Sequence, residues 1–413
     1  MRDPVTTTPD MRPEATDPPL RVLFFVEGFT DIRFVVGLST ICDLTMVVPA
    51  GAYKHSSLRA RVAASRASIR VHEIEGGRLA FQLRSLAYLW RVASQFDVIL
   101  SQEMLRGSLN ATVVGRLRRV PVVTTMSMPA LEYFQCRRER RQIGALSAWV
   151  GEAIIRGLLA INGRLATRCL ALGPYLMQVA ARTCPRTEPG YYYGVDTHLF
   201  RPAAVHERAV LRQKLDLPVN KFLIVLASRI SHEKDPETVI EAVAKARANG
   251  LDAVLLNLGG GYQRFIDLAS AIGIRDASDW IMGRPAVHPM RELADYFRAA
   301  DVLVQGSLEE GLGLSPLEAL ACETPVVATN VGGMAAHLGA YAALTPRRDA
   351  DAMSRAILVV AALPEVARRQ ARRGRDYVCR EWSREKAFAE LRRSLVEAAT
   401  GTSQPVTPGE VAA

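Results

Sequence analysis

Two cations that follow an apolar run are the first residues whose types and spacing could do chemistry. Arg229 and Lys234 lie on the segment 228–236, directly after the apolar run 222–227 and before a predicted helix. Open α/β sheets bind ligands at the carboxyl ends of their parallel strands. Arginine offers a planar fork of donors and lysine a compact charge, so together they suit a chain of phosphates. The pair predicts a phosphate-binding loop; the alternative is a solvated loop with a helix cap.

Two glutamates flank the start of a second predicted helix. Glu310 precedes a turn with two glycines, and Glu318 falls one or two turns inside the helix. Free N–H groups at a helix N-terminus form an anion site, and here they belong to Gly313, Leu314 and Ser315. Carboxylates repel a phosphate, so these glutamates make sense if each binds a hydroxyl beside it, as sugars provide. The alternatives are a helix-dipole role for Glu310 and a solvated helix face for Glu318.

Alternating strands and helices must hold these residues in place. The first half has strand-like runs at 21–26, 44–48, 69–74, 97–100, 121–125 and 169–172, with helical patterns such as 79–94 and 108–118. The second half has strand-like runs at 222–227, 253–258, 280–282, 301–304, 325–328 and 342–344. Apolar strands separated by helices are typical of a parallel sheet covered on both faces. We therefore expect an α/β protein with two facing doubly wound sheets and one ligand cleft between them.

The length of 413 residues favours two or three domains. We expect a disordered tail over 1–19, a first domain over 20–197, a second domain over 203–376, C-terminal helices over 377–399 that pack back toward the first domain, and a disordered tail over 400–413. The 49% hydrophobic and 23% charged composition excludes a disordered or fibrous chain.

These motifs resemble the signature of the family-4 glycosyltransferases, which are retaining nucleotide-sugar enzymes of the GT-B fold. Glu310 and Glu318 match the two glutamates of the E-x7-E motif, and Arg229 and Lys234 match the diphosphate-binding cations. Further similar stretches are the interdomain segment 194–202, the segment 321–329 after the second glutamate, and the glycine pair 332–333. The resemblance covers about residues 194–344, and the first half shares only the layout.

The resemblance implies a role for each residue. Arg229 and Lys234 would neutralise the departing diphosphate, Glu318 would hold the nucleotide ribose, and Glu310 would bind a sugar hydroxyl near the reacting carbon. The other implied donor-binding residues are Met282, Gly283 and Arg284 beside the base, the amides of Gly313, Leu314 and Ser315, and Gly260 and Gly28 on glycine turns. We expect a retaining glycosyltransferase that uses a nucleoside diphosphate sugar, with no metal or other cofactor. The expected acceptor is a sugar, lipid-linked or polysaccharide compound.

The sequence departs from the family pattern at two places. Glu323 stands where members usually have a glycine at a helix end, which we expect to affect stability rather than chemistry. Many relatives carry a histidine near the acceptor, after the fourth or fifth strand of the first domain. The corresponding segment here, 124–129, has none, so no acceptor-side base is named.

Other functions fit the sequence less well. The alternative is a non-catalytic GT-B scaffold that binds a nucleotide sugar or a protein partner. The presence of all four charged motif residues argues against it; they are Arg229, Lys234, Glu310 and Glu318. A glycosidase needs two carboxyls facing each other across one bond, which a loop and a helix interior do not offer. The Asp349-Ala350-Asp351 triplet fits a helix N-cap better than a metal site, and no cluster of residues has the spacing of metal ligands. Residues 28–31 do not form a dinucleotide-binding fingerprint, which argues against a nicotinamide dehydrogenase.

Positive charge is concentrated in the first half. The net charge of the chain is +10, and residues 20–200 alone carry +11. Arg137–Arg141 run into an apolar stripe at positions 143, 146, 150, 154, 158, 161 and 165, with Trp149 on it. A basic cluster at the start of an amphipathic helix can lie on an anionic membrane surface; the alternatives are a stripe packed on the sheet and codon bias.

Cysteine usage and the N-terminus bear on localisation. The six scattered cysteines favour reduced thiols, the charge-free apolar stretches are shorter than a membrane span, and residues 1–19 lack the core of a signal peptide. We expect a cytoplasmic protein, either free or peripheral on the inner face of the membrane, with no nucleic acid partner.

Overall fold

The computed structural model describes residues 19–28, 30–54, 57–65, 67–139, 144–285 and 290–402. The predicted tails lie almost entirely outside these residues, as do Arg140 and Arg141 of the basic cluster and Ile143 of the stripe.

The first domain is built on a parallel sheet that, within the described residues, has seven strands in the order β3-β2-β1-β4-β5-β6-β7. The strands are β1 (Arg21–Phe25), β2 (Asp43–Pro49), β3 (Ile69–Ile74), β4 (Val98–Ser101), β5 (Val122–Met126), β6 (Arg168–Leu172) and β7 (Thr187–Gly190). The helices are α1 (Ile32–Ile41), α2 (Ala50–Lys54), α3 (Ser57–Ala64), α4 (Arg78–Val92), α5 (Arg106–Arg118), α6 (Ala130–Glu139), α7 (Ala145–Leu165) and α8 (Gly173–Ala181), with a 3-10 turn η1 (Ala93–Gln95).

The second domain has a six-stranded parallel sheet in the order β10-β9-β8-β11-β12-β13, again counted within the described ranges. Its strands are β8 (Phe222–Leu226), β9 (Ala253–Asn257), β10 (Ile281–Gly283), β11 (Val302–Gln305), β12 (Val326–Thr329) and β13 (Ala343–Thr345). Its helices are α9 (Val205–Lys214), α10 (Pro236–Ala248), α11 (Tyr262–Ala271), α12 (Met290–Ala299), α13 (Leu314–Ala321), α14 (Gly332–His337) and α15 (Ala350–Ala362), with 3-10 turns η2 (His232–Lys234) and η3 (Ala277–Asp279).

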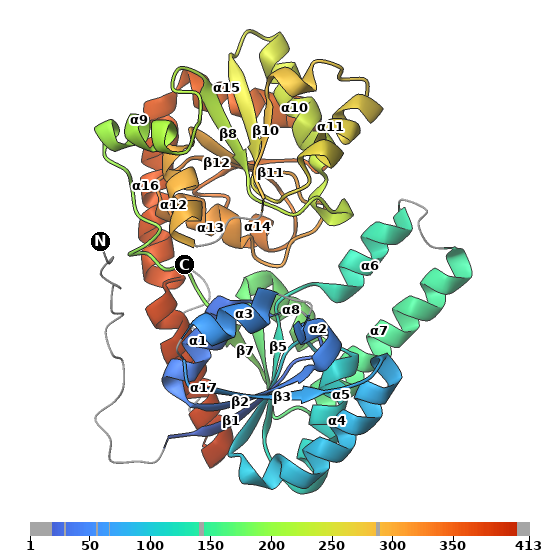
Figure 1. Ribbon diagram of the computed structural model, residues 1–413. Helices are drawn as coiled ribbons and strands as arrows, with labels where there is room; N and C mark the ends of the chain where they lie inside the picture. The colour runs from blue at the N-terminus through green and yellow to red at the C-terminus, as the bar shows by residue number, and fades with distance from the viewer. Residues whose placement is uncertain are drawn as a thin grey trace.

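Strand β1 illustrates why both faces of a sheet must be covered. Leu23 and Phe25 belong to a core formed with α4 and α5, whereas Val22 and Phe24 belong to a core formed with α1 and the C-terminal helix. Successive side chains of a strand point to opposite faces, so an apolar run with no alternation needs a helix layer on each side. The prediction of two facing doubly wound sheets is confirmed (Figure 1).

Two long C-terminal helices connect the domains. Helix α16 (Pro364–Glu381) contacts α13 of the second domain, and α17 (Arg384–Thr400) contacts α1 and three strands of the first. Between them the amide of Val195 donates to the carbonyl of Trp382 at 2.7 Å, and the amide of Arg384 donates to the carbonyl of Val195 at 2.9 Å. The chain therefore crosses twice between the domains at one place, along the edge drawn at the left of Figure 1.

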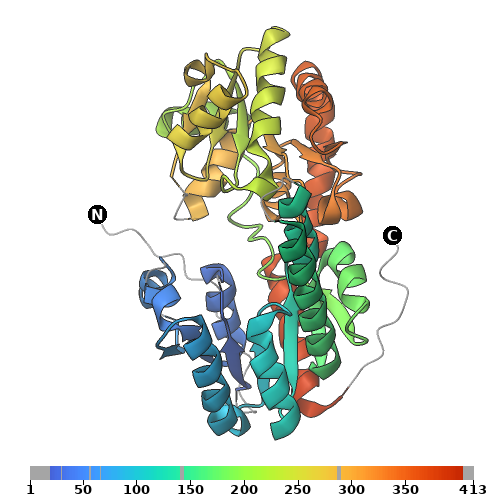
Figure 2. The same cartoon turned by 90° about the vertical axis from the view of Figure 1, so that its right-hand side faces the viewer.

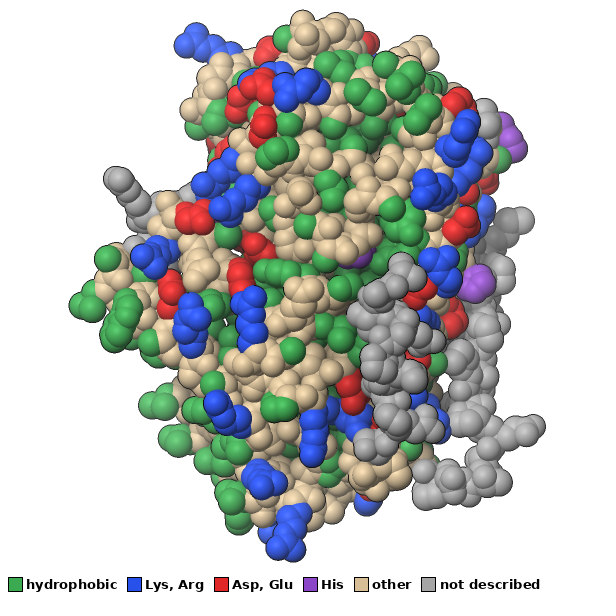
Figure 3. Space-filling view, turned by 180° about the vertical axis from the view of Figure 1, so that it is seen from behind, with side chains coloured by type: hydrophobic (Ala, Val, Ile, Leu, Met, Phe, Trp, Pro, Cys, Tyr) green, Lys and Arg blue, Asp and Glu red, His purple; other side chains and the backbone are tan. Residues whose placement is uncertain are grey.

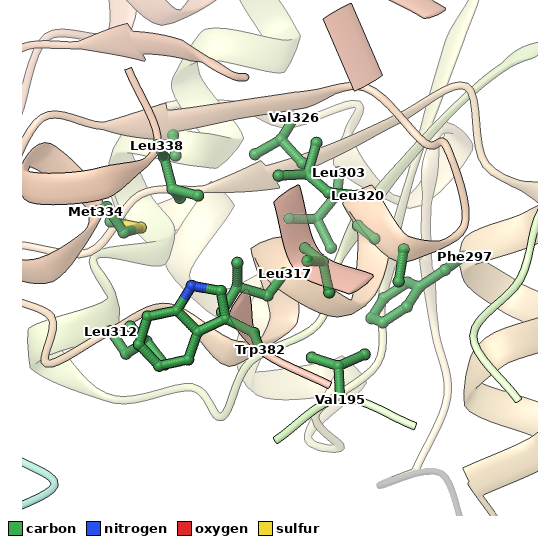
Figure 4. Close-up of a cluster of buried hydrophobic side chains, with 14 of the residues drawn as sticks. Val195, Phe297, Leu303, Leu312, Leu317, Leu320, Val326, Met334, Leu338 and Trp382 are labelled. Carbon is green, nitrogen blue, oxygen red and sulfur yellow. The ribbon is translucent and has the colours of Figure 1, made fainter. Parts of the chain in front are cut away.

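Apolar side chains join this crossing to the site elements. Trp382 and Val195 pack in one buried cluster with residues of α13 and its neighbours, as Figure 4 shows. Leu317 and Leu320 of α13 are fully buried there, and Leu312 precedes that helix. Close packing of these buried side chains fixes the orientation of α13. The core beneath the helix therefore holds both its N-terminus and Glu318 in place.

Helices α6 and α7 form a projecting hairpin. Helix α6 rises from the first domain toward η2 of the second, and α7 runs back down beside α5 (Figures 1 and 2). Glu139, at the end of α6, lies 3.5 Å from Arg347 and 3.2 Å from Arg348 of the second domain. The hairpin therefore borders the gap between the domains.

Candidate functional site

The predicted phosphate-binding loop follows β8. It forms the turn η2, after which Asp235 has a positive φ of 44° and Pro236 begins α10. The hydroxyl of Thr238 donates to Asp235 at 2.6 Å, and the amide of Leu308 donates to the carbonyl of Glu233 at 2.8 Å. The second contact attaches this loop to the loop that follows β11, so the ends of two neighbouring strands form one surface.

Lys234 and Glu310 meet on that surface. The lysine Nζ lies 2.5 Å from Oε2 of the glutamate, and the hydroxyl of Ser307 donates to the same oxygen at 3.2 Å. The two side chains are only 17% and 14% exposed, so their charges interact with little screening by water. The structure thus brings together one residue that is predicted to bind phosphate and one that is predicted to bind the sugar.

The N-terminus of α13 lies beside this pair. Gly313 has a φ of 91°, a left-handed conformation that favours glycine, and the hydroxyl of Ser315 donates to the carbonyl of Ala227 at 3.0 Å. Helix α13 therefore starts at the end of β8. The amides of Gly313, Leu314 and Ser315 belong to its free N-terminal turn.

The glycine pair 332–333 packs against this loop. A Cβ at Gly332 would lie 2.2 Å from the carbonyl oxygen of Glu310, and one at Gly333 would lie 2.0 Å from that of Gly311. The amide of Gly333 also donates to the Glu310 carbonyl at 2.8 Å. Any side chain at either position would displace the loop, which explains why glycine is needed there.

Glu318 lies on the buried face of α13. The alternative expectation, that it lies on a solvated helix face, is wrong. It is 3% exposed, and burial raises the pKa of its carboxyl above the ordinary value, an effect that Arg33 opposes. Its Oε1 accepts a hydrogen bond at 2.6 Å from the Nη1 of Arg33, which comes from the first domain. Sequence reasoning missed Arg33, because the two residues are 285 positions apart.

Arg229 is placed differently from Lys234. Its side chain is 81% exposed and lies 3.7 Å from Glu233. Burial raises the pKa of the Tyr133 hydroxyl on α6 well above its ordinary value, and the nearby carboxylates of Glu310 and Glu233 raise it further, whereas Arg229 opposes the shift. The arginine therefore lies near the Lys234–Glu310 pair, and its side chain is mostly exposed to solvent.

The remaining predicted donor residues lie at strand ends. The amide of Gly260 donates to the carbonyl of Arg284 at 3.0 Å, and a Cβ at Gly283 would lie 2.6 Å from Tyr262. Met282 and Gly283 close β10. Gly28 is exposed, and a Cβ there would meet nothing within 4 Å. Packing therefore explains glycine at 283 but not at 28.

A buried carboxyl lies on the first domain, close to where that domain meets the Glu310 loop. Glu103 follows β4 and accepts hydrogen bonds from the Ser127 amide, at 3.3 Å, and from the Ser127 hydroxyl, after β5. Its φ of 64° is strained for a residue with a side chain, and burial raises its pKa to about 7. The Ser127 carbonyl lies 2.6 Å from where a Cβ of Gly311 would be, which places Glu103 and Ser127 across from the Glu310 loop.

Two further features of the site concern metal binding and one partly buried histidine, His337, which lies close to the start of α13. Among the residues that the structure describes, no group of three or more His, Cys, Asp or Glu side chains could hold a metal ion. The Nε2 of His337 lies 2.8 Å from the carbonyl oxygen of Leu312, and burial lowers its pKa to about 4. His337 is thus neutral and supports the turn before α13. Asp349 caps α15 through a 2.8 Å bond from the amide of Ala352, as predicted for an N-cap.

The second domain is similar in sequence to known glycosyltransferases. Residues 207–377 match the family described as glycosyl transferases group 1. Among curated relatives, this chain is 30% identical over 274 residues to D-inositol 3-phosphate glycosyltransferase 1 of Catenulispora acidiphila, covering 63% of each chain. It is 40% identical over 145 residues to D-inositol 3-phosphate glycosyltransferase of Arthrobacter sp., covering 34% of this chain and 33% of the relative. The chain thus spans less than two thirds of these relatives.

Solved structures share the whole architecture. HepE of Anabaena in complex with UDP superposes with a TM-score of 0.74 at 16% identity, over 92% of this chain and 100% of that chain. Sucrose-phosphate synthase of Thermosynechococcus elongatus superposes with a TM-score of 0.71 at 19% identity, over 93% of this chain and 100% of that chain. The chain therefore has the two-domain GT-B fold, and residues 207–377 of its second domain match glycosyl transferases group 1.

Proposed function

We propose that this protein is a retaining glycosyltransferase that moves a sugar from a nucleoside diphosphate sugar to an acceptor hydroxyl. The observation that carries the proposal is the Lys234–Glu310 pair beside the N-terminus of α13. It puts a cation for the diphosphate and a carboxylate for the sugar side by side at the ends of two parallel strands. HepE has been solved with UDP and with UDP-glucose, so we propose a uridine diphosphate sugar as the donor.

In this reaction the departing diphosphate gains negative charge as its bond to the sugar breaks. Arg229, Lys234 and the first amides of α13 are donors that face that charge, and fixed donors of this kind often supply the largest catalytic contribution. Glu318 would bind the ribose hydroxyls and Glu310 a hydroxyl of the sugar. Because side chains and amides neutralise the diphosphate, we propose that the reaction needs no metal ion.

We place the acceptor on the first-domain side, at Glu103 and Ser127. A carboxylate and a hydroxyl can hold an acceptor hydroxyl by hydrogen bonds. Ser127 lies against the Glu310 loop and is bonded to Glu103. They occupy the strand ends where many relatives carry a histidine.

We also propose that the acceptor is lipid-linked and that the first domain docks on an anionic membrane at the inner face. The apolar stripe of α7 does not pack on the sheet: Leu146, Trp149, Val150 and Ile154 are exposed by between 42% and 76%. Helix α7 is long and apolar enough to span a membrane. Only 17% of its most apolar 18-residue stretch is buried inside the protein. Such a surface suits an interface between water and lipid.

A second apolar stripe extends this surface. Leu79, Leu83, Leu86 and Trp90 recur along α4 and are exposed. Helices α4, α5 and α7 lie side by side over one face of the sheet. Exposed arginines lie among the stripes, at positions 78, 84, 91, 116, 118, 119, 156 and 164. Figure 3 shows the result from behind, with hydrophobic and basic side chains interspersed along the left edge of the lower half. Cations beside apolar anchors favour anionic lipids.

The first experiment is a thermal shift and calorimetry screen of the full chain against UDP, GDP and ADP, followed by turnover of UDP-glucose. We expect UDP to bind and to raise the melting temperature, and UDP-glucose to release UDP. Binding of UDP with no turnover under any acceptor would instead favour the non-catalytic scaffold. Binding of none of the three nucleotides would overturn the proposal.

A further inference from the structure

Arg33 connects the first domain directly to the predicted ribose ligand of the second. Its Nη1 donates to Oε1 of Glu318 at 2.6 Å, and the two side chains are 24% and 4% exposed. Within the described residues, no other side chain forms a hydrogen bond or ion pair with the Glu318 carboxylate. The carboxylate is thus covered by the arginine and by the start of α1.

The guanidinium is fixed in this position by three further hydrogen bonds and one ring contact. Its Nε and Nη2 donate to the two carboxylate oxygens of Asp31 at 3.1 and 3.0 Å, and Nη2 also donates to the hydroxyl of Tyr193 at 2.6 Å. The guanidinium carbon lies 4.1 Å from the centre of the Tyr193 ring. Asp31 is itself fixed, because it caps α1 by accepting from the Arg33 amide at 2.8 Å. A planar fork that is held on one side presents its remaining donor in a defined direction.

We propose that Arg33 is an interdomain latch that competes with the nucleotide ribose for Glu318. The inference rests on the proposed function, since it needs Glu318 to bind the donor. A ribose cannot reach a carboxylate that is almost fully covered, so the donor enters only after Arg33 and the start of α1 have moved away. Ribose hydroxyls then replace the guanidinium as hydrogen-bond donors.

The latch couples donor binding to the arrangement of the domains. While the Arg33–Glu318 pair is intact, it holds the first domain against α13 and covers the carboxylate. The apparent affinity for donor is reduced by the fraction of molecules in the closed state. Arg33 is therefore a positioning residue, which acts on the donor through Glu318 and the domain arrangement.

The test is calorimetry of UDP with the full chain. Arg33→Ala removes the competitor, and we expect UDP to bind about tenfold more tightly, the size of an ordinary coupling between two sites. Arg33→Lys keeps the charge without the fork and should give a smaller gain. The matched control is Arg106→Ala, because Arg106 is also a first-domain arginine but pairs with Glu27 of its own domain. It should keep the wild-type affinity.

Small-angle scattering of the unliganded proteins gives a second readout. We expect a larger radius of gyration for Arg33→Ala than for the wild type and for Arg106→Ala. Unchanged or weaker UDP binding by Arg33→Ala, with wild-type binding intact, would overturn the latch and leave the proposed function standing. If neither the wild type nor Arg33→Ala binds UDP, GDP or ADP, both proposals fail.

Discussion

The Nζ of Lys234 lies 2.5 Å from Oε2 of Glu310, although the two residues come from loops after different strands, β8 and β11. The same loops are joined by the 2.8 Å bond from the Leu308 amide to the Glu233 carbonyl. The distance between this cation and this carboxylate is therefore set by the backbone. This rigidity makes the pair suitable for work at a bond between a sugar and a phosphate.

Replacing Lys234 should damage turnover more than binding. Lys234→Ala removes one fixed donor from the departing diphosphate, so we expect kcat for UDP-glucose turnover to fall by about 10²–10³. The control is Lys245→Ala, whose lysine pairs with Asp351 on the surface at 2.7 Å. A raised KM with unchanged kcat would show that Lys234 binds the ground state and transition state equally.

Arg229 should separate activity from stability. Because its side chain is 81% exposed, Arg229→Ala should change the free energy of unfolding by no more than about 0.5 kcal/mol. We nevertheless expect kcat to fall by on the order of 10²-fold. Denaturant unfolding measures the stability, and steady-state kinetics measure kcat. The control is Arg275→Ala, because Arg275 is also an exposed arginine of the second domain. An active Arg229→Ala enzyme would remove this residue from the diphosphate site.

The sheets were predictable because their strands are continuous apolar runs. Each predicted run overlaps a strand within one or two residues, as at β3 (Ile69–Ile74) and β12 (Val326–Thr329). Strand β7 was missed because its sequence, Thr-Glu-Pro-Gly, carries turn-forming residues and no apolar pattern. It joins the sheet as an edge strand beside β6, where proline and glycine are tolerated.

Site contacts were predictable only within the second domain. The cations and glutamates there follow the ends of recognisable strands. The Arg33–Glu318 contact could not be found in this way, because it depends on how the two domains meet. Glu103 was missed for another reason: nothing in the sequence shows that Ser127 would hold its carboxyl or that burial would raise its pKa to about 7.

Glu103 should make stability depend on pH. A carboxyl whose pKa rises from 4.5 to about 7 on folding binds its proton more tightly in the folded state. Stability is therefore lost as the pH rises through this range, by up to about 3 kcal/mol. Glu103→Gln removes this titration, so the variant should gain stability relative to the wild type at pH 8 compared with pH 4.5.

Denaturant unfolding at the two pH values measures that difference. The control is Glu241→Gln, which removes a half-exposed carboxyl 3.1 Å from Lys245 on a helix surface. Its difference from the wild type should be much the same at both pH values. A Glu103→Gln difference that does not grow toward pH 8 would contradict a carboxyl with a raised pKa at this position.

The exposed stripe of α7 should hold the protein on anionic lipid. Replacing Leu146, Trp149 and Ile154 by serine removes apolar side chains that contribute about 1.5 kcal/mol or more each when buried. We expect binding to vesicles of phosphatidylglycerol and phosphatidylcholine to weaken at least about tenfold. The matched control replaces Val210, Val359 and Val366, which are similarly exposed on the second domain and its C-terminal helices. It should sediment with vesicles as the wild type does.

Raised salt should also release the wild type, because it screens the arginines around the stripe. If the wild type fails to sediment with these vesicles at low salt, or if the control triple loses binding equally, the stripe is not a membrane surface. The basic first domain would then have to meet a soluble anionic acceptor instead.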